Sequence, residues 1–195
     1  VRMVLDSYAQ NSNNTNIYSY WNTNCMTDDI TAENNATAVS YATYGNSTIK
    51  GDVETWYNSN IGNNTTYSNK ISTSKFCNDI TLPSGEASQL FAPCRRLYMD
   101  INRSPSMTCS SNSHVYNLSV GLITSDEITY AGALRGDTNQ NYYLYNSNLS
   151  YRWWTISPGR WYTDKKVWAF NLNSEDGALV LTPLNNSLLL RPVIS

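Results

Sequence analysis

The last part of the chain is a succession of short apolar and aromatic segments separated by turn residues. Between Tyr142 and Ser195 these segments are NYYLY, YRWWTI, KVWAFNL, GALVL and LLLRPVI, with PGR, EDG and NNS between some of them. This spacing predicts a run of antiparallel strands joined by tight turns. A sheet must bury at least one face against another layer of structure. Whether the preceding segments form helices or strands therefore decides the fold class.

Two helix signals precede these strands. NSTIKGDVETWYNSNIGN offers Ser47 or Thr48 as the N-cap and Gly62 as the end of the helix. Its apolar residues at helical spacing are Ile49, Val53, Trp56 and Tyr57. In GLITSDEITYAGA, Thr124 and Glu127 predict a capping box, and a glycine follows near the end. Helices followed by a run of strands predict an α+β fold with an antiparallel sheet.

The other segments are less regular. The opening VRMVLDSY alternates apolar and polar residues and predicts a strand, with IYSYW as its hairpin partner, and LSVGLI predicts a short buried strand. Residues 23–45 show little periodicity and are expected to be mostly loop. Residues 63–116 are loop-rich, and disulfides or small strands are expected to organise so long a connection. Residues 1–195 show no linker and are expected to form one domain.

Composition limits the classes of partner. Charged residues make up 14% of the chain and the formal net charge is -2, without the basic excess expected of a protein that binds nucleic acid. No apolar run is long enough to span a bilayer, so membrane insertion is not expected either. The polar residues are mainly Asn, Ser and Thr, accompanied by 15 Tyr. This composition is typical of extracellular and viral binding proteins, although an A/T-rich genome also favours Asn and Tyr codons.

The cysteines indicate an exported protein. Cys25, Cys77, Cys94 and Cys109 are widely spaced and form no C-x-x-C pair, so a zinc site is not expected. One or two long-range disulfides are predicted, and free buried thiols are the alternative. Four cysteines allow three pairings, and the sequence does not choose among them.

Catalytic patterns are weak throughout the chain. His114 is the single histidine and lies in a polar segment, which leaves no base for a hydrolase triad. Adjacent acids occur at Asp28–Asp29, Asp126–Glu127 and Glu175–Asp176. The second pair is explained as helix capping and the third as part of a hairpin turn. A carbohydrate-active enzyme with an unrecognised acid pair remains an alternative, and no cofactor or metal is expected.

Several segments together resemble a known family. VETWYNSNI, KFCNDI, VGLITSDEITYAG, YYLYN, WTISP and the ending RPVIS, spread over residues 53–195, look like a domain of bacterial surface and secreted proteins. That domain is similar to C-type-lectin-like folds of the formylglycine-generating-enzyme branch. The same branch includes the variable proteins of diversity-generating retroelements, whose C-terminal segment is rewritten at adenines to display new binding residues.

The resemblance implies a two-helix domain whose first and last strands pair, and a non-enzymatic, extracellular binding function on the final strands and loops. Three features depart from the family. The calcium-binding tripeptides Glu-Pro-Asn and Trp-Asn-Asp of C-type lectins are absent, so calcium-dependent glycan binding is not carried over. The cysteine pair of the formylglycine-generating enzymes has no matching motif, and Leu189 stands where a glycine is expected before LRPV.

The candidate ligand-binding residues belong to the last strands. The alternation in KVWAFNLN places Trp168, Phe170 and Leu172 toward the core and the asparagines outward. The segment GRWYTDKK is predicted to be a loop whose Arg, Trp and Tyr have the composition of a binding hot spot. The predicted ligand-binding residues are Arg160, Trp161, Tyr162, Asp164, Lys165, Asn171, Asn173 and Asn185.

These observations favour an extracellular, cell-surface or virion-surface domain that binds a protein or glycan on a host or target cell. Retroelement diversification of its C-terminal surface is a further hypothesis. A structural pilus or stalk domain is an alternative function. For the segment GRWYTDKK itself, the alternative to binding is that Trp161 closes the end of the barrel and Arg160 or Lys165 is simply solvated.

Overall fold

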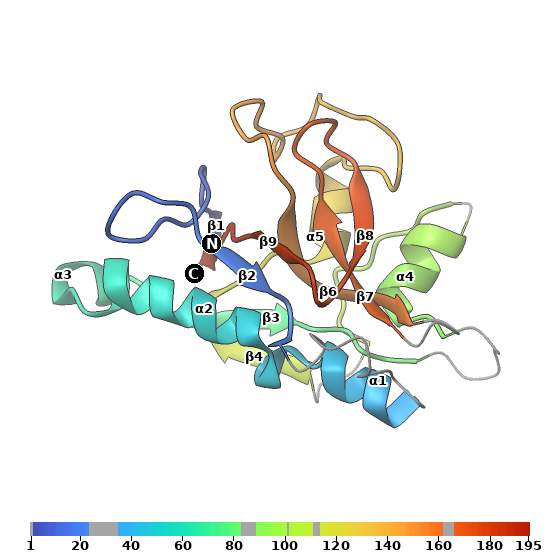
Figure 1. Ribbon diagram of the computed structural model, residues 1–195, viewed down its shortest axis with the longest axis horizontal. Coiled ribbons are helices and arrows are strands. Elements are labelled where there is room, and N and C mark those ends of the chain that lie inside the picture. Colours follow the sequence, from blue (N-terminus) through green and yellow to red (C-terminus); the bar gives the residue numbers. More distant parts are fainter. Residues whose placement is uncertain (1, 24–34, 83–88, 101, 111–113, 162–165) are drawn as a thin grey trace.

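The computed structural model describes residues 2–23, 35–82, 89–100, 102–110, 114–161 and 166–195, and it has an α+β fold (Figure 1). The large sheet has the order β2 (Tyr18–Tyr20), β9 (Ser187–Leu189), β6 (Trp153–Trp161), β7 (Val167–Leu172) and β8 (Leu179–Pro183). A small sheet joins β1 (Met3–Val4), β10 (Val193–Ile194) and β5 (Val120–Gly121). A separate pair joins β3 (Ser74–Cys77) and β4 (Val115–Leu118).

The first and last strands pair, as expected. β1 runs antiparallel to β10 with Met3 opposite Ile194, and Figure 1 shows the two chain ends beside each other. Of the predicted hairpin between the first two segments, only an antiparallel bridge between Gln10 and Asn16 forms, because β1 pairs with β10 and β2 pairs with β9. The C-terminal segment takes the place of the hairpin partner: Pro192 O accepts from Leu5 N–H at 2.9 Å, and Leu190 O accepts from Ala9 N–H at 2.9 Å.

The helix α2 (Thr48–Tyr57) confirms the first helix prediction. Ser47 is the N-cap and its hydroxyl accepts from the N–H of Lys50 at 3.3 Å. The apolar face of α2 is buried in the main core, as the helical spacing predicted. A π-helical turn, η3 (Asn58–Gly62), continues α2 and ends at the glycine that was expected to stop it.

The helix α5 (Ser125–Ala131) has the predicted capping box. Thr124 Oγ1 accepts from Glu127 N–H at 3.0 Å, and Glu127 Oε2 accepts from Thr124 N–H at 2.9 Å. The helix ends at Gly132, whose φ of 127° lies in the region that glycine favours. Local capping chemistry therefore determines both ends of this helix.

Two expectations for the less regular segments are wrong. Helix α1 (Asn35–Ala42) lies in the segment expected to be loop; it buries only the small residues Ala38 and Ala42 and packs against β7. The helix lacks a large apolar face, so its sequence gives little helical signal. Its packing against the rest of the protein stabilises it instead. The NYYLY segment is a turn in which Tyr142 O accepts from Tyr145 N–H at 3.1 Å, not a strand. The remaining helical segments are η2 (Tyr44–Asn46), α3 (Thr65–Ser68), α4 (Ala92–Cys94) and η4 (Arg95–Met99).

One long-range disulfide confirms the prediction made from the cysteine spacing. Cys77 in β3 is bonded to Cys109, 32 residues along the chain, and together with the β3–β4 pair it organises the loop-rich region. Cys94 is a free, buried thiol, and burial raises its pKa to about 12, so it stays protonated at neutral pH. Cys25 lies outside the described residues. A structural disulfide is typical of proteins that fold in an oxidising environment.

The main core lies between the large sheet and the helices that precede it. Trp21, Trp153 and Trp154 are fully buried there, and the indole N–H of Trp154 donates to Ser19 O at 2.9 Å. A smaller apolar cluster lies under α4 and η4 and consists of Leu90, Cys94, Leu97, Phe170 and Leu179. Strand β7 is therefore covered on both faces. Among the described helices, none is long and apolar enough to cross a membrane.

Candidate functional site

The predicted loop after Pro158–Gly159 begins as a strand. β6 continues through both residues to Trp161, with register shifts against β7 on either side of Pro158. Proline lacks the N–H of a regular ladder, so it occupies a bulge here instead of ending the strand. On the other edge, Gly159 O accepts from Phe91 N–H at 3.0 Å. Arg160 and Trp161 are therefore strand residues.

Trp161 lies in the core. Its side chain belongs to the main apolar cluster, and its N–H donates to Gln89 O at 2.8 Å. This placement agrees with the alternative in which Trp161 closes one end of the sheet, and it leaves little of the ring for a ligand. Tyr162, Asp164 and Lys165, which were also predicted to bind ligand, lie outside the described residues.

Asn171 was expected to face outward but is fully buried, with Nδ2 donating to Val180 O at 3.4 Å. Phe170 and Leu172 are buried, as predicted, but Val167 and Ala169, on the side of β7 that was predicted to face outward, are buried as well and belong to the main core. The reason is that apolar residues cover both faces of β7, and alternation alone does not show which face meets the larger core.

Asn173 and Asn185 are both partly exposed, in turns that flank β8. Asn173 follows the end of β7, whereas Asn185 lies in the turn between β8 and β9. Strand register places Arg160 opposite Trp168 and Trp168 opposite Pro183, so Asn185 lies at the same end of the sheet as Arg160. Asn173 lies at the other end, separated by the length of β8, roughly 15 Å.

The structure gathers Arg160 with residues that the sequence did not connect to it. The Arg160 guanidinium lies 5.1 Å from the centre of the Tyr98 ring and 5.5 Å from that of Trp168, and Nη1 donates to the Tyr98 hydroxyl at 3.3 Å. The guanidinium of Arg135 stacks on the same Tyr98 ring. Arginine over an aromatic face is attracted by the ring's negative face and is held in one orientation.

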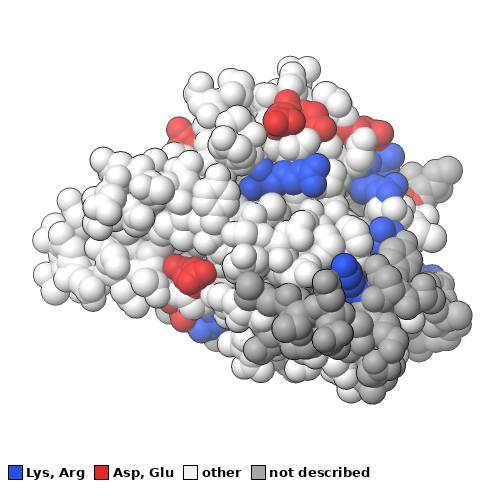
Figure 2. Space-filling view, viewed as in Figure 1, with Lys and Arg blue, Asp and Glu red and all other residues white. Residues whose placement is uncertain are grey.

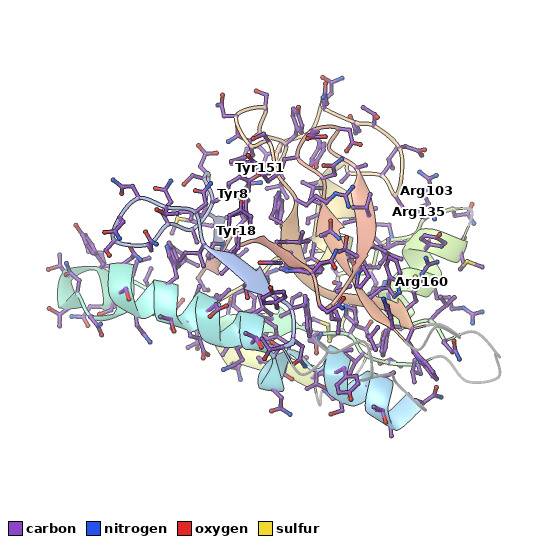
Figure 3. The ribbon with its side chains drawn as sticks, in the orientation of Figure 1. Tyr8, Tyr18, Arg103, Arg135, Tyr151 and Arg160 are labelled. Carbon is purple, nitrogen blue, oxygen red and sulfur yellow. A yellow bond between two sulfur atoms is a disulfide. The ribbon has the colours of Figure 1, made fainter. Side chains whose placement is uncertain are left out.

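These side chains come from separate elements. Tyr98 lies on η4, and the segment carrying Arg135 is bound to the edge of β8, where Leu179 O accepts from Gly136 N–H at 3.1 Å. Arg103 lies nearby along the same side of the molecule (Figure 3) and pairs with Asp137 at 2.6 Å. Figure 2 shows basic side chains on this side of the molecule with acidic side chains beside them. We call Tyr98, Arg103, Arg135, Arg160 and Trp168 the arginine surface.

Comparison with protein-family models, curated proteins and solved structures gives no match to this chain.

A group of tyrosines on the other side of the large sheet has a structural role. The Tyr8 hydroxyl donates to Tyr151 O at 2.6 Å and accepts from Tyr151 N–H at 3.0 Å, while Tyr18 and Tyr151 are half exposed beside it (Figure 3). Burial raises the pKa of Tyr8, which keeps the hydroxyl proton available for the bond that it donates. This hydroxyl joins the N-terminal segment to the chain entering β6.

A charged cavity of about 320 Å³ was not predicted from the sequence. It lies between the β3–β4 pair, the disulfide and the start of α5. Its lining includes Arg2, Asp79, Arg96, Asp126 and Glu127. Arg96 donates to both oxygens of Asp126, at 2.5 and 2.6 Å, and to Asp79 at 2.9 Å, while Arg2 pairs with Glu127. These partners are distant in sequence, so no local motif signals them.

The acid pairs are accounted for where the structure describes them. Glu127 caps α5, as expected, whereas Asp126 is bound by Arg96. Asp176 accepts from Ala178 N–H at 2.9 Å in the predicted hairpin turn. Asp28 and Asp29 lie outside the described residues. Within the described part of the chain, no group of three or more His, Cys, Asp or Glu side chains is arranged to hold a metal ion.

Proposed function

We propose that this chain is a non-enzymatic, extracellular domain that binds a protein or glycan on a host or target-cell surface through the arginine surface. The observation that carries the proposal is the stacking of Arg135 and Arg160 on Tyr98. Arginines and aromatic residues dominate binding hot spots, and an arginine already held by a ring loses less rotamer freedom when it binds. Guanidinium groups match carboxylate, sulfate and phosphate groups, so an anionic ligand is favoured.

Other features support an extracellular setting and the C-type-lectin-like fold of the formylglycine-generating-enzyme branch. The Cys77–Cys109 disulfide and the amide- and hydroxyl-rich composition are both typical of exported proteins. The pairing of β1 with β10 and the presence of the helices α2 and α5 agree with the layout that the family resemblance implies. Part of the proposed ligand face, Arg160 and Trp168, lies on the final strands, where that family binds.

Replacing both Arg135 and Arg160 with glutamine is expected to weaken binding of the anionic ligand at least about tenfold, because two hot-spot side chains are lost. The ligand is first sought by screening the domain against sulfated and sialylated oligosaccharides and acidic peptides. The dissociation constant is then measured for the best probe by isothermal titration calorimetry. Arg152→Gln, at an exposed arginine outside the arginine surface, is the matched control. Equal affinity of the folded double variant and the native chain would contradict the proposal.

We further infer that the C-terminal surface is diversified at adenine positions of the gene, as in variable proteins of retroelements. Asn173 and Asn185 are partly exposed turn residues with adenine-rich codons, whereas Asn171 is buried. Sequencing the coding region of residues 153–195 across a natural population is expected to show replacements at the Asn173 and Asn185 codons and none tolerated at Asn171. If adenines vary no more than the other bases, the surface is not diversified in this way.

A further inference from the structure

One member of the arginine surface already holds an acidic partner. Arg103 Nη1 donates to Asp137 Oδ2 at 2.6 Å, whereas no described carboxylate forms an ion pair with Arg135. Asp137 follows Arg135 by only two residues, so its negative charge lies within the group of guanidiniums that is proposed to bind the ligand. The Asp137 carboxylate and an acidic group of a ligand therefore suit the same cations.

The backbone of Arg103 is held by a turn that does not involve Asp137. Arg103 N–H donates to Asp100 O at 3.0 Å, and Asn102 N–H donates to Asp100 Oδ1 at 2.9 Å. The φ of Arg103 is 46°, in the left-handed region that residues with a Cβ rarely occupy. Such strained residues persist where the surrounding structure holds them, and they cluster at binding sites. We therefore expect Arg103 to keep its place when Asp137 is replaced.

The segment that carries Asp137 is held in place as well, while the ion pair itself is open to solvent. Asp137 follows Gly136, whose φ is 70° and whose N–H donates to Leu179 O at 3.1 Å at the edge of β8. The side chains of Arg103 and Asp137 are 35% and 56% exposed, so a ligand reaches both of them. An ion pair as exposed as this one contributes little to stability. A ligand can therefore replace Asp137 at Arg103 without disturbing the core.

We propose that Asp137 is an internal competitor of the ligand, an inference that rests on the function proposed for the arginine surface. The Asp137 carboxylate occupies the position on Arg103 that an acidic group of the ligand takes. Because Asp137 belongs to the same chain, its effective concentration at Arg103 is on the order of millimolar, and a ligand with one acidic group gains little from the exchange. A ligand with several acidic groups engages Arg135 and Arg160 at the same time and replaces Asp137. The competitor therefore selects a chain that carries several sulfate or carboxylate groups.

Replacing Asp137 with asparagine removes the competing charge and keeps the size of the side chain. The probe is a heparin hexasaccharide, titrated calorimetrically at one fixed ionic strength because salt screens exposed charges. We expect Asp137→Asn to lower the dissociation constant of the probe about fivefold, as suits the loss of one exposed competing pair. Asp52→Asn makes the same change in net charge on α2, away from the labelled arginines (Figure 3), and should change the dissociation constant less than about twofold.

A double-mutant cycle identifies the cation through which Asp137 acts. In a chain that already carries Arg103→Gln, Asp137→Asn is expected to change the dissociation constant less than about twofold, because the cation that the substitution would release is absent. The proposal is overturned by an equal gain with and without Arg103, by no gain from Asp137→Asn, or by the same gain from Asp52→Asn.

The Arg135→Gln/Arg160→Gln variant distinguishes a failure of this inference from a failure of the proposed function. If that variant binds the hexasaccharide as tightly as the native chain, the arginine surface is not the ligand site, and both proposals fail. If it binds more weakly while Asp137→Asn brings no gain, the proposed function stands and only the role of Asp137 is refuted. Absence of binding by both the native chain and the Asp137→Asn variant would also refute that role.

Discussion

Replacing Arg96 with methionine is expected to lower the free energy of unfolding by about 3–5 kcal/mol, as typical for a buried ion pair that loses one partner. The Arg96 side chain is 17% exposed and is the cation bound to both Asp79 and Asp126. Burial alone would lower the pKa of Arg96, but the hydrogen bonds and charges of Asp126 and Asp79 raise it. The guanidinium therefore stays charged, and its removal leaves two buried carboxylates without their cation.

Urea denaturation followed by tryptophan fluorescence measures this change. Arg152→Met is the matched control, because Arg152 is exposed and a surface substitution typically changes stability by less than about 0.5 kcal/mol. Adding Asp79→Asn and Asp126→Asn to the Arg96→Met variant is expected to restore part of the loss, since the uncompensated charges are then removed. A loss below about 1 kcal/mol for Arg96→Met would show that water or other groups compensate the carboxylates.

Removing the disulfide with Cys77→Ala and Cys109→Ala is expected to lower the free energy of unfolding by about 3–4 kcal/mol. The bond closes a loop between residues 32 apart, and chain-entropy arguments give this magnitude for such a loop. The measurement is thermal or urea unfolding of the variant beside the native chain. A reductant should destabilise the native chain to the same extent but have no further effect on the variant. A difference within about 0.5 kcal/mol would mean that the unfolded chain is already constrained in this region.

The same bond is expected to support the charged cavity. It holds the segment in which Ser106 N–H donates to Asp126 and the Ser110 hydroxyl donates to Asp79 at 2.8 Å. When that segment is released, both carboxylates lose donors and one wall of the cavity.

The elements with local signals could be predicted from the residue pattern alone. The capping box of Thr124 and Glu127, the N-cap at Ser47 and the stop at Gly62 all lie within one or two turns of the helix that they bound. Such contacts form between near neighbours, so the residue pattern is sufficient to predict them. The α+β class followed from the order of these helices and the later strands.

Most strand neighbours and the faces that the strands bury depend on long-range packing. The alternation in residues 1–8 predicted a strand, but its pairing with the last strand was expected only from the family resemblance and not from the residue pattern. The alternation in β7 did not reveal that Asn171 is buried. The hydrogen bond between Arg160 and Tyr98 joins residues 62 positions apart in the sequence, and that between Arg96 and Asp126 joins residues 30 positions apart. A side chain's partners at such separations depend on how the whole chain packs, and no local pattern carries that information.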